Sequence, residues 1–302
     1  MNLFKSKDVS PMLLESQEKP FDDDNYIFEL KLDGIRCIAY LDNKTSLRNK
    51  RNVELLPIYP ELTYLYKQVK ERCVLDGELV VLNEDGSPNF FLLQKRSLLT
   101  DKFKIELESK RHSVQFVAYD ILQKGERAIV DLPLFERKKI LDEVVKEGGN
   151  LSVSRIVEGK GKALFNLTKK LGLEGIVAKD KNSVYEMGKR SKSWIKIKNL
   201  KDEDFLICGI VLGEEGKIKD LILGQYKNDK LTFRGKVFVN ISKQEEGIIL
   251  AFALKHQSKP HFKVRGDIVW VKPELVCTVQ YMMLTRDGAM RQPVFKGLRY
   301  DK

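Results

Sequence analysis

Charged side chains recur inside short apolar segments of this chain, and this pattern limits the folds that it can adopt. In the first such segment, Glu29 and Lys31 alternate with Phe28, Leu30 and Leu32. Residues two apart point to the same face of a strand, so the two charges share one face. Because burying a charge is costly unless it is paired or bound to a ligand, this strand needs a polar neighbour.

Four later segments repeat the pattern, over residues 75–80, 116–122, 174–179 and 194–198. The charged or aromatic residues within them are Glu78, Tyr119, Glu174, Lys179, Lys196 and Lys198. Taken singly, each has an ordinary interpretation, such as a surface lysine on an edge strand or a tyrosine in a core. Together they indicate a polar site between two sheets, large enough for a nucleoside triphosphate.

The spacing of apolar residues predicts an α+β protein in which short strands dominate. Strands are predicted at 26–32, 74–82, 114–122, 175–179 and 194–198, and helices at 56–73, 134–146 and 162–171. In the helix at 134–146, apolar residues gather on one face and the charged residues are assigned to the other.

A polar run at 199–204 marks a boundary, which predicts domains at 1–200 and 201–302. Beyond it, strands are predicted at 205–212, 221–226, 231–239, 267–271 and 276–282, with a helix at 242–256. Five short strands with one inserted helix are typical of a small Greek-key barrel of the oligonucleotide-binding type, the OB-fold.

Composition adds a weaker indication about the partner. The formal net charge is +11, and residues 201–302 hold 18 Lys+Arg against 13 Asp+Glu. Such an excess favours a polyanion such as nucleic acid. The four cysteines and three histidines lack the spacing of a zinc site, which argues against both a disulfide scaffold and structural zinc. No signal peptide or membrane span is recognisable, so we predict a cytoplasmic protein.

The segment from Lys31 to Arg36 reads Lys-Leu-Asp-Gly-Ile-Arg, the KxDGxR signature of covalent nucleotidyltransferases. The four later segments follow in that superfamily's order, so the chain resembles ATP-dependent DNA ligases, RNA ligases and mRNA capping enzymes. Its start at 11–13 and its ending at 297–302 most resemble the ligase module of bacterial non-homologous end-joining DNA ligases. The resemblance implies an ATP-grasp-like nucleotidyltransferase domain of antiparallel sheets with helices, followed by an OB-fold.

The resemblance also implies roles for individual residues. Lys31 is the catalytic nucleophile, which attacks the α-phosphorus of ATP to form a lysyl-AMP intermediate. Glu78 and Glu174 are the expected ligands of Mg²⁺ (or Mn²⁺), because hard cations prefer carboxylate oxygens. Tyr119 is expected to stack on adenine. The other implied ATP contacts are Glu29, Arg36, Arg48, Lys179, Lys196, Lys198, Arg299 and Lys302.

Two details of the sequence depart from this picture. Arg48 follows a leucine where the superfamily usually has a serine. Strict alternation would also put Glu174 and Lys179 on opposite faces of their strand, unless Gly175 interrupts the pattern.

The predicted function is an ATP-dependent DNA ligase that seals 5′-phosphate/3′-hydroxyl nicks in duplex DNA, in DNA repair or end joining. The implied partners are nicked or broken duplex DNA and a Ku-type end-binding protein, with a monomeric, nucleoid-associated chain that contacts no membrane. Two alternatives remain open. One is an RNA ligase or RNA-capping guanylyltransferase, which shares the strand motifs, and the other is a non-catalytic nucleic-acid clamp.

Overall fold

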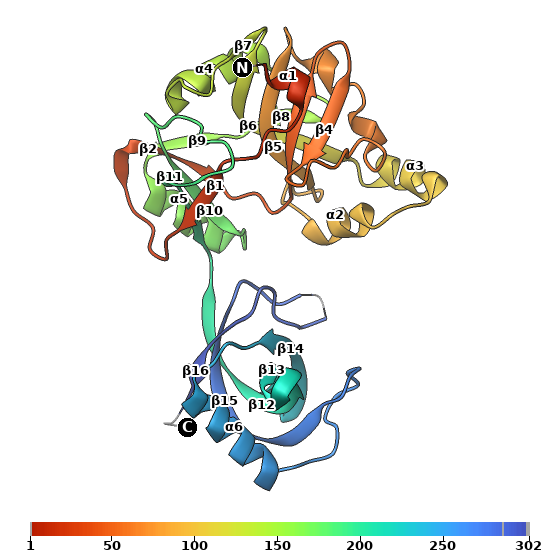
Figure 1. Ribbon diagram of the computed structural model, residues 1–302, viewed down its shortest axis with the longest axis vertical. Coiled ribbons are helices and arrows are strands. Elements are labelled where there is room, and N and C mark those ends of the chain that lie inside the picture. The colour runs from red at the N-terminus through yellow and green to blue at the C-terminus, as the bar shows by residue number, and fades with distance from the viewer. Residues whose placement is uncertain (1, 286, 300–302) are drawn as a thin grey trace. The chain divides into compact units, whose positions relative to one another are not determined.

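The computed structural model describes residues 2–285 and 287–299, and the chain divides into two compact units, Met1–Asn199 and Leu200–Lys302 (Figure 1). Both units combine sheets with helices. All four cysteines are buried free thiols. Among the described residues, no helix is both long and apolar enough to cross a bilayer.

The first unit contains two sheets that are almost entirely antiparallel. One sheet has the order β4-β3-β5-β6-β7, with β8 pairing β6, and its strands are β3 Ile35–Leu41, β4 Thr45–Asn49, β5 Cys73–Val81, β6 Val114–Lys124, β7 Arg127–Ala128 and β8 Leu151–Val153. The other has the order β1-β11-β10-β2-β9, and its strands are β1 Leu13–Ser16, β2 Asp23–Leu30, β9 Ile156–Gly159, β10 Gly175–Asp180 and β11 Arg190–Lys198. The charged segments singled out above therefore lie on both sheets.

The strand β3 is apolar on both faces, and this joins the two sheets. Cys37 and Ala39 pack into a core with β5 and β6, whereas Ile38 and Tyr40 face the opposite way. That second face shares a buried cluster with Trp194 of β11. Because alternate residues of a strand point to opposite sides, one strand contributes to both cores and fixes the facing sheets.

Five α-helices accompany the sheets of the first unit. They are α1 Leu3–Ser6, α2 Phe90–Ser97, α3 Lys102–Arg111, α4 Leu134–Val144 and α5 Gly161–Lys170. The last two confirm the helices predicted from periodicity. The predicted helix at 56–73 is wrong: this stretch forms only two short 3-10 turns, Pro60–Leu62 and Leu65–Gln68. Pro57 and Pro60 explain the error, since proline lacks the amide that a helix interior requires.

The second unit is a five-stranded sheet with the order β14-β13-β12-β15-β16. Its elements are β12 Lys201–Leu212, β13 Ile218–Lys227, β14 Lys230–Phe238, α6 Lys243–Lys255, β15 Val269–Tyr281 and β16 Val294–Leu298, with a 3-10 turn at Glu214–Gly216. The prediction differs in three places. It has no strand at 294–298, where β16 pairs with β15. The strands predicted at 267–271 and 276–282 are one continuous strand, β15, and the polar run after residue 200 already belongs to β12.

Candidate active site

Lys31 follows directly after β2 and is fixed at both its backbone and its side chain. Its backbone amide donates to the Gly175 carbonyl oxygen at 2.9 Å. Its Nζ lies 2.9 Å from Glu174 Oε2, and Lys198 Nζ lies 3.3 Å from Glu174 Oε1. The Lys31 side chain keeps 19% of its surface exposed, against 3% for Glu174. One buried carboxylate therefore holds two lysines from different strands, with the Lys31 amine still accessible.

Gly175 explains how Glu174 and Lys179 both reach the site. Its φ of +140° lies in the region that favours glycine, so the alternation of side chains is broken at the start of β10. A Cβ on Gly175 would lie 2.1 Å from the Ile197 carbonyl oxygen of β11. As a result, Glu174 contacts Lys31 while Lys179 contacts Glu29, the next β2 residue on the same face.

Glu78 lies in the middle of β5, opposite Arg36 of β3. Burial raises the pKa of its carboxyl to about 8, against the opposing effect of the Arg36 and Lys31 charges. Within the described ranges it makes no ion pair or hydrogen bond with another side chain. Gly34 explains how the chain after Lys31 passes so close, because a Cβ there would lie 2.7 Å from Glu78 Cγ and 2.2 Å from the Leu79 carbonyl oxygen.

Lys196 belongs to the same end of the site. Burial, followed by the charge of neighbouring Lys198, lowers the pKa of its amine. Over residues 2–285 and 287–299, no group of three or more histidine, cysteine or acidic side chains is arranged to hold a metal ion. Any cation bound here would therefore depend on Glu78, Glu174 and the oxygens of a ligand.

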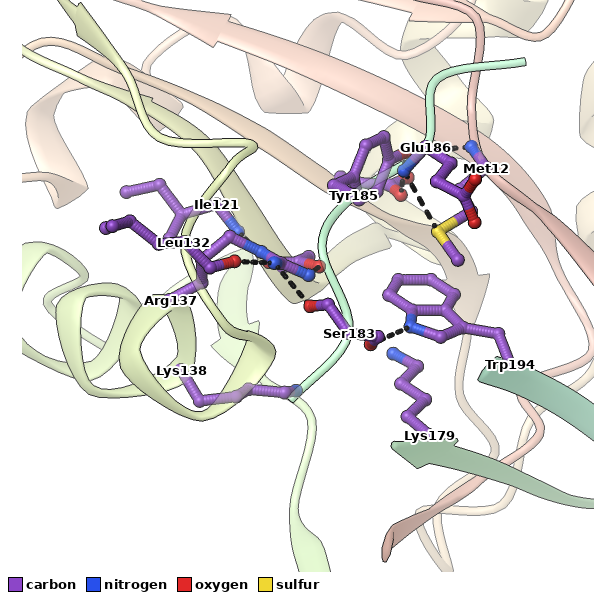
Figure 2. A network of polar contacts seen from close by, with 12 residues as sticks. Met12, Ile121, Leu132, Arg137, Lys138, Lys179, Ser183, Tyr185, Glu186 and Trp194 are labelled. Carbon is purple, nitrogen blue, oxygen red and sulfur yellow. Dashed lines mark hydrogen bonds and ion pairs between the residues drawn. The ribbon is translucent and has the colours of Figure 1, made fainter. Parts of the chain in front are cut away.

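Glu29 forms a second, more deeply buried cluster. Its carboxylate accepts a hydrogen bond from Lys138 of α4 at Oε1, and Lys179 Nζ lies 2.6 Å from Oε2. The Lys179 ammonium also lies 4.4 Å from the centroid of the Tyr119 ring. It lies 4.2 Å from the centroid of the Trp194 ring, beside which it is drawn in Figure 2. Burial lowers the pKa of Lys179 to about 8, although the Glu29 charge opposes this shift.

Arg36 is held between the two clusters by a buried carboxylate that the sequence analysis missed. Arg36 Nε and Nη2 donate to the two oxygens of Asp76 at 2.8 and 2.5 Å. The Tyr185 hydroxyl donates to the same carboxylate at 2.6 Å and accepts from the Met12 amide at 3.1 Å. The Arg36 guanidinium lies 5.0 Å from the Tyr119 ring centroid, so this ring has cations near it from both β3 and β10.

Two of the predicted contacts have other partners within their own units, and a third predicted contact is not among the described residues. Arg48 Nη1 donates to the Asn52 carbonyl oxygen at 2.8 Å, and its Nη2 lies 3.7 Å from Glu54, so its contacts stay within its own hairpin. Arg299 pairs with Asp204 at 3.4 Å inside the second unit. Lys302 lies outside the described residues.

The helix α4 holds two functional candidates that the sequence analysis assigned to solvent. Arg137 and Lys138 are 0% and 5% exposed, so placing them on the charged outer face is wrong. Arg137 donates through Nε and Nη2 to the two oxygens of Asp120, both at 2.9 Å. The signal was available, because these residues follow Leu134 at i+3 and i+4 and therefore share its buried face.

Comparison with known proteins agrees with this architecture. The family described as ATP dependent DNA ligase domain matches residues 11–198, and the family described as ATP dependent DNA ligase C terminal region matches residues 214–302. The SPbeta prophage-derived DNA ligase-like protein LigB of Bacillus subtilis is 34% identical over 96% of this chain and 99% of its own length. The multifunctional non-homologous end joining protein LigD of Mycolicibacterium smegmatis is 33% identical over 99% of this chain, which spans only 39% of LigD.

Solved structures give the same result. Mycobacterial DNA ligase D complexed with ATP and MES superposes with a TM-score of 0.58 at 28% identity, over 97% of this chain and 96% of that one. A Lig E DNA ligase shares the fold at 18% identity with a TM-score of 0.67, over 96% of this chain and 100% of that one. The predicted nucleotidyltransferase fold with an OB-fold is confirmed, and neither an RNA-directed enzyme nor a silent clamp is favoured. The chain belongs to the ATP-dependent DNA ligase family.

Proposed function

We propose that Lys31 forms a lysyl-AMP intermediate, which the chain uses to seal nicks in duplex DNA. The observation that carries this proposal is the ion pair of Lys31 with Glu174. An amine must lose a proton before it attacks phosphorus, and Glu174 Oε2, 2.9 Å from Lys31 Nζ, is placed to accept it. The attack forms a bond between Nζ and the α-phosphorus, breaks the bond from that phosphorus to the bridging oxygen, and releases pyrophosphate.

The Glu29 cluster suits the base and ribose of the nucleotide. Tyr119 offers an aromatic face for stacking on adenine, with Arg36 and Lys179 at its edges. Glu29 accepts hydrogen bonds and Lys179 donates them, which suits an adenine edge that carries both an amino group and a ring nitrogen. We therefore assign Lys179 to the base, whereas the sequence suggested that it contacts a phosphate or the sugar of ATP.

The Lys31 cluster suits the phosphates. Lys196 and Lys198 lie on β11 beside Glu174, where their charges can neutralise the triphosphate. Glu78 fits a divalent cation, because its half-buried carboxyl has no partner among the described side chains and has a raised pKa. Glu78 and Glu174 are the residues that would hold Mg²⁺ or Mn²⁺, and the chemistry supplied by such a cation would be withdrawal of charge from the phosphate oxygens.

The later steps follow from the same intermediate. AMP passes from Lys31 to the 5′-phosphate at a nick, and the 3′-hydroxyl then displaces AMP to form the phosphodiester bond. The second unit, with 18 Lys+Arg against 13 Asp+Glu over 201–302, is proposed to bind the duplex backbone. Arg299 and Lys302 are proposed to orient the leaving pyrophosphate, which requires Arg299 to exchange its Asp204 partner for phosphate.

The biological setting is also part of the proposal. The likeness to LigD favours end joining of broken DNA over other repair, by a monomer recruited to nucleoid DNA by a Ku-type end-binding protein. Sealing of cohesive and blunt ends, with and without such a partner, tests this setting separately from nick sealing.

The decisive experiment labels the protein with ATP carrying ³²P at the α-phosphate. We expect an acid-labile, alkali-stable adduct on wild type that the Lys31→Ala variant lacks, followed by sealing of a nicked duplex. Labelling from GTP but not ATP, or sealing by Lys31→Ala at the wild-type rate, would overturn the proposed function.

A further inference from the structure

The buried cluster around Glu29 holds more positive than negative charge. The single Glu29 carboxylate faces two ammonium groups, those of Lys138 and Lys179, and the side chains of all three are at most 6% exposed. The nearby Asp120 is already matched by Arg137 through two hydrogen bonds. One buried ammonium is therefore in excess, which is unfavourable unless a ligand supplies a hydrogen-bond acceptor or a negative charge for it.

The two lysines contact Glu29 in different ways. Lys138 donates a true hydrogen bond to Oε1. Lys179 Nζ lies 2.6 Å from Oε2, yet it is a buried nitrogen that makes no well-oriented hydrogen bond to any described residue. Its other near neighbours are the faces of Tyr119 and Trp194. Lys138 thus fixes the carboxylate. Lys179 has three N–H donors and only one close carboxylate oxygen among the described residues, so it retains donors for a ligand.

The helix α4 is built to deliver Lys138 to this place. Lys138 extends from the helix toward the β10 lysine in Figure 2, beside Arg137, whose Nη1 donates to the Ser183 carbonyl oxygen at 2.9 Å. Arg137 binds β6 through Asp120, and Lys138 binds β2 through Glu29, so adjacent residues connect one helix to both sheets. Lys138 is therefore held rigidly and cannot easily follow a ligand.

We propose that Lys138 is a positioning residue: by holding Glu29, it leaves the Lys179 ammonium free to donate to the base of the bound nucleotide. The inference rests on the proposed function, which places the base against Tyr119. Without Lys138, Glu29 and Lys179 would form a closed one-to-one ion pair. The donor offered to the ligand would then be lost, although every residue that touches the nucleotide would remain.

The test uses the full chain with Lys138→Met, Lys138→Gln and Lys138→Arg, and Lys139→Met as the matched control. Lys139 is the next residue of α4 and is exposed. Self-adenylation is measured against ATP concentration. We expect Lys138→Met to raise the KM for ATP about tenfold, a loss of one hydrogen bond to a charged group, with the rate at saturation within about twofold. Lys138→Arg and Lys139→Met should stay close to wild type.

A pH profile separates positioning from simple packing. The groups that face Lys179 are Glu29 of β2, Lys138 of α4, and Asp120 and Tyr119 of β6, with the uncharged Trp194 of β11. In wild type, KM should rise above about pH 8 as the Lys179 ammonium loses its proton. Lys138→Gln keeps a donor for Glu29 but removes the like charge, so the rise should begin at higher pH.

Two outcomes would overturn the inference. One is an unchanged KM and pH profile in a folded Lys138→Gln or Lys138→Met protein, and the other is a lower saturated rate with unchanged KM. Calorimetric ATP binding in a Lys31→Ala background, with and without Lys138→Met, keeps this result independent of chemistry. If ATP does not label the wild-type chain, but changing Lys138 still weakens ATP binding, only the proposed function is refuted. If ATP does not bind at all, both the proposed function and this inference are refuted.

Discussion

The Lys31 ammonium lies 2.9 Å from Glu174 Oε2. Lys31 directly follows β2, and Glu174 directly precedes β10, the strand that pairs with β2. The second oxygen of Glu174 is 3.3 Å from Lys198. A single buried side chain therefore sets the distance between the proposed nucleophile and Lys198, the lysine that we propose to bind phosphate. Its removal should affect chemistry more than folding.

The Glu174→Gln variant tests this relationship. The amide keeps the shape of the carboxylate but cannot accept the Lys31 proton, so we expect the saturated rate of self-adenylation to fall about 10²-fold. The measurement is single-turnover labelling with ATP. Glu158→Gln is the control, because Glu158 is an exposed carboxylate of β9 that also pairs with a lysine, Lys181, at 2.5 Å. Equal rates in the two variants would contradict the role of Glu174.

Substitution of Asp76 should lower the free energy of unfolding, an effect that is distinct from any effect on catalysis. It is 0% exposed and accepts from Arg36 and Tyr185. Asp76→Asn should lower the free energy of unfolding by about 2–4 kcal/mol, since it leaves a largely buried guanidinium without its counterion. Tyr185→Phe removes only one hydrogen bond and should lose about 1 kcal/mol. Urea unfolding compares them, and a Tyr185→Phe loss as large as that of Asp76→Asn would disprove this ranking.

Glu78 predicts how stability depends on pH. Burial raises the pKa of its carboxyl from 4.5 to about 8. Between these values the folded protein holds a proton that the unfolded chain has released, so this group lowers stability as pH rises from about 4.5 to about 8. At pH 8, Glu78→Gln should therefore be more stable than wild type by roughly 2–4 kcal/mol, and by little at pH 4.5.

Urea unfolding without divalent cations, at several pH values, measures this difference. Glu84→Gln is the matched control, because Glu84 is an exposed carboxylate shortly after the same strand. A pH-independent gap between wild type and Glu78→Gln would show that Glu78 does not titrate in this range.

The sequence predicted those features that depend on alternation along one strand. Glu29 and Lys31, two residues apart, do meet charged partners in Lys179 and Glu174, and the Glu78 carboxyl does lie near the charges of Lys31 and Glu174. It failed where a single backbone angle or a contact between distant elements decides the structure. The φ of Gly175 could not be read from its neighbours, and the burial of Asp76 depends on Arg36 and Tyr185 coming together.

The helix α4 shows a different kind of failure. Charged residues are usually assigned to solvent, and Arg137 and Lys138 were treated that way. Their spacing from Leu134 placed them on the buried face, and their partners, Asp120 and Glu29, lie on two other elements. The prediction followed the charge of Arg137 and Lys138, which favours exposure, although their helical spacing from Leu134 correctly indicates burial.

The Gly175→Ala substitution tests whether the backbone conformation at the start of β10 positions Glu174 for the chemistry at Lys31. At a φ of +140°, an added Cβ would lie 2.1 Å from the Ile197 carbonyl oxygen and 2.9 Å from the Lys198 Cα, so β10 and β11 must separate. We expect a loss of about 3 kcal/mol or more in the free energy of unfolding, and weaker Lys31 labelling in the protein that remains folded.

Gly172→Ala supplies the comparison, because its φ is +66° and no atom lies within 4 Å of the added Cβ. It carries backbone strain of about 1–2 kcal/mol without the steric clash, and should label Lys31 normally. Thermal unfolding and ATP labelling of both variants separate strain from strand displacement. If Gly175→Ala labelled Lys31 at the Gly172→Ala rate, the close approach of β10 to β11 would not be what positions Glu174 between the two lysines.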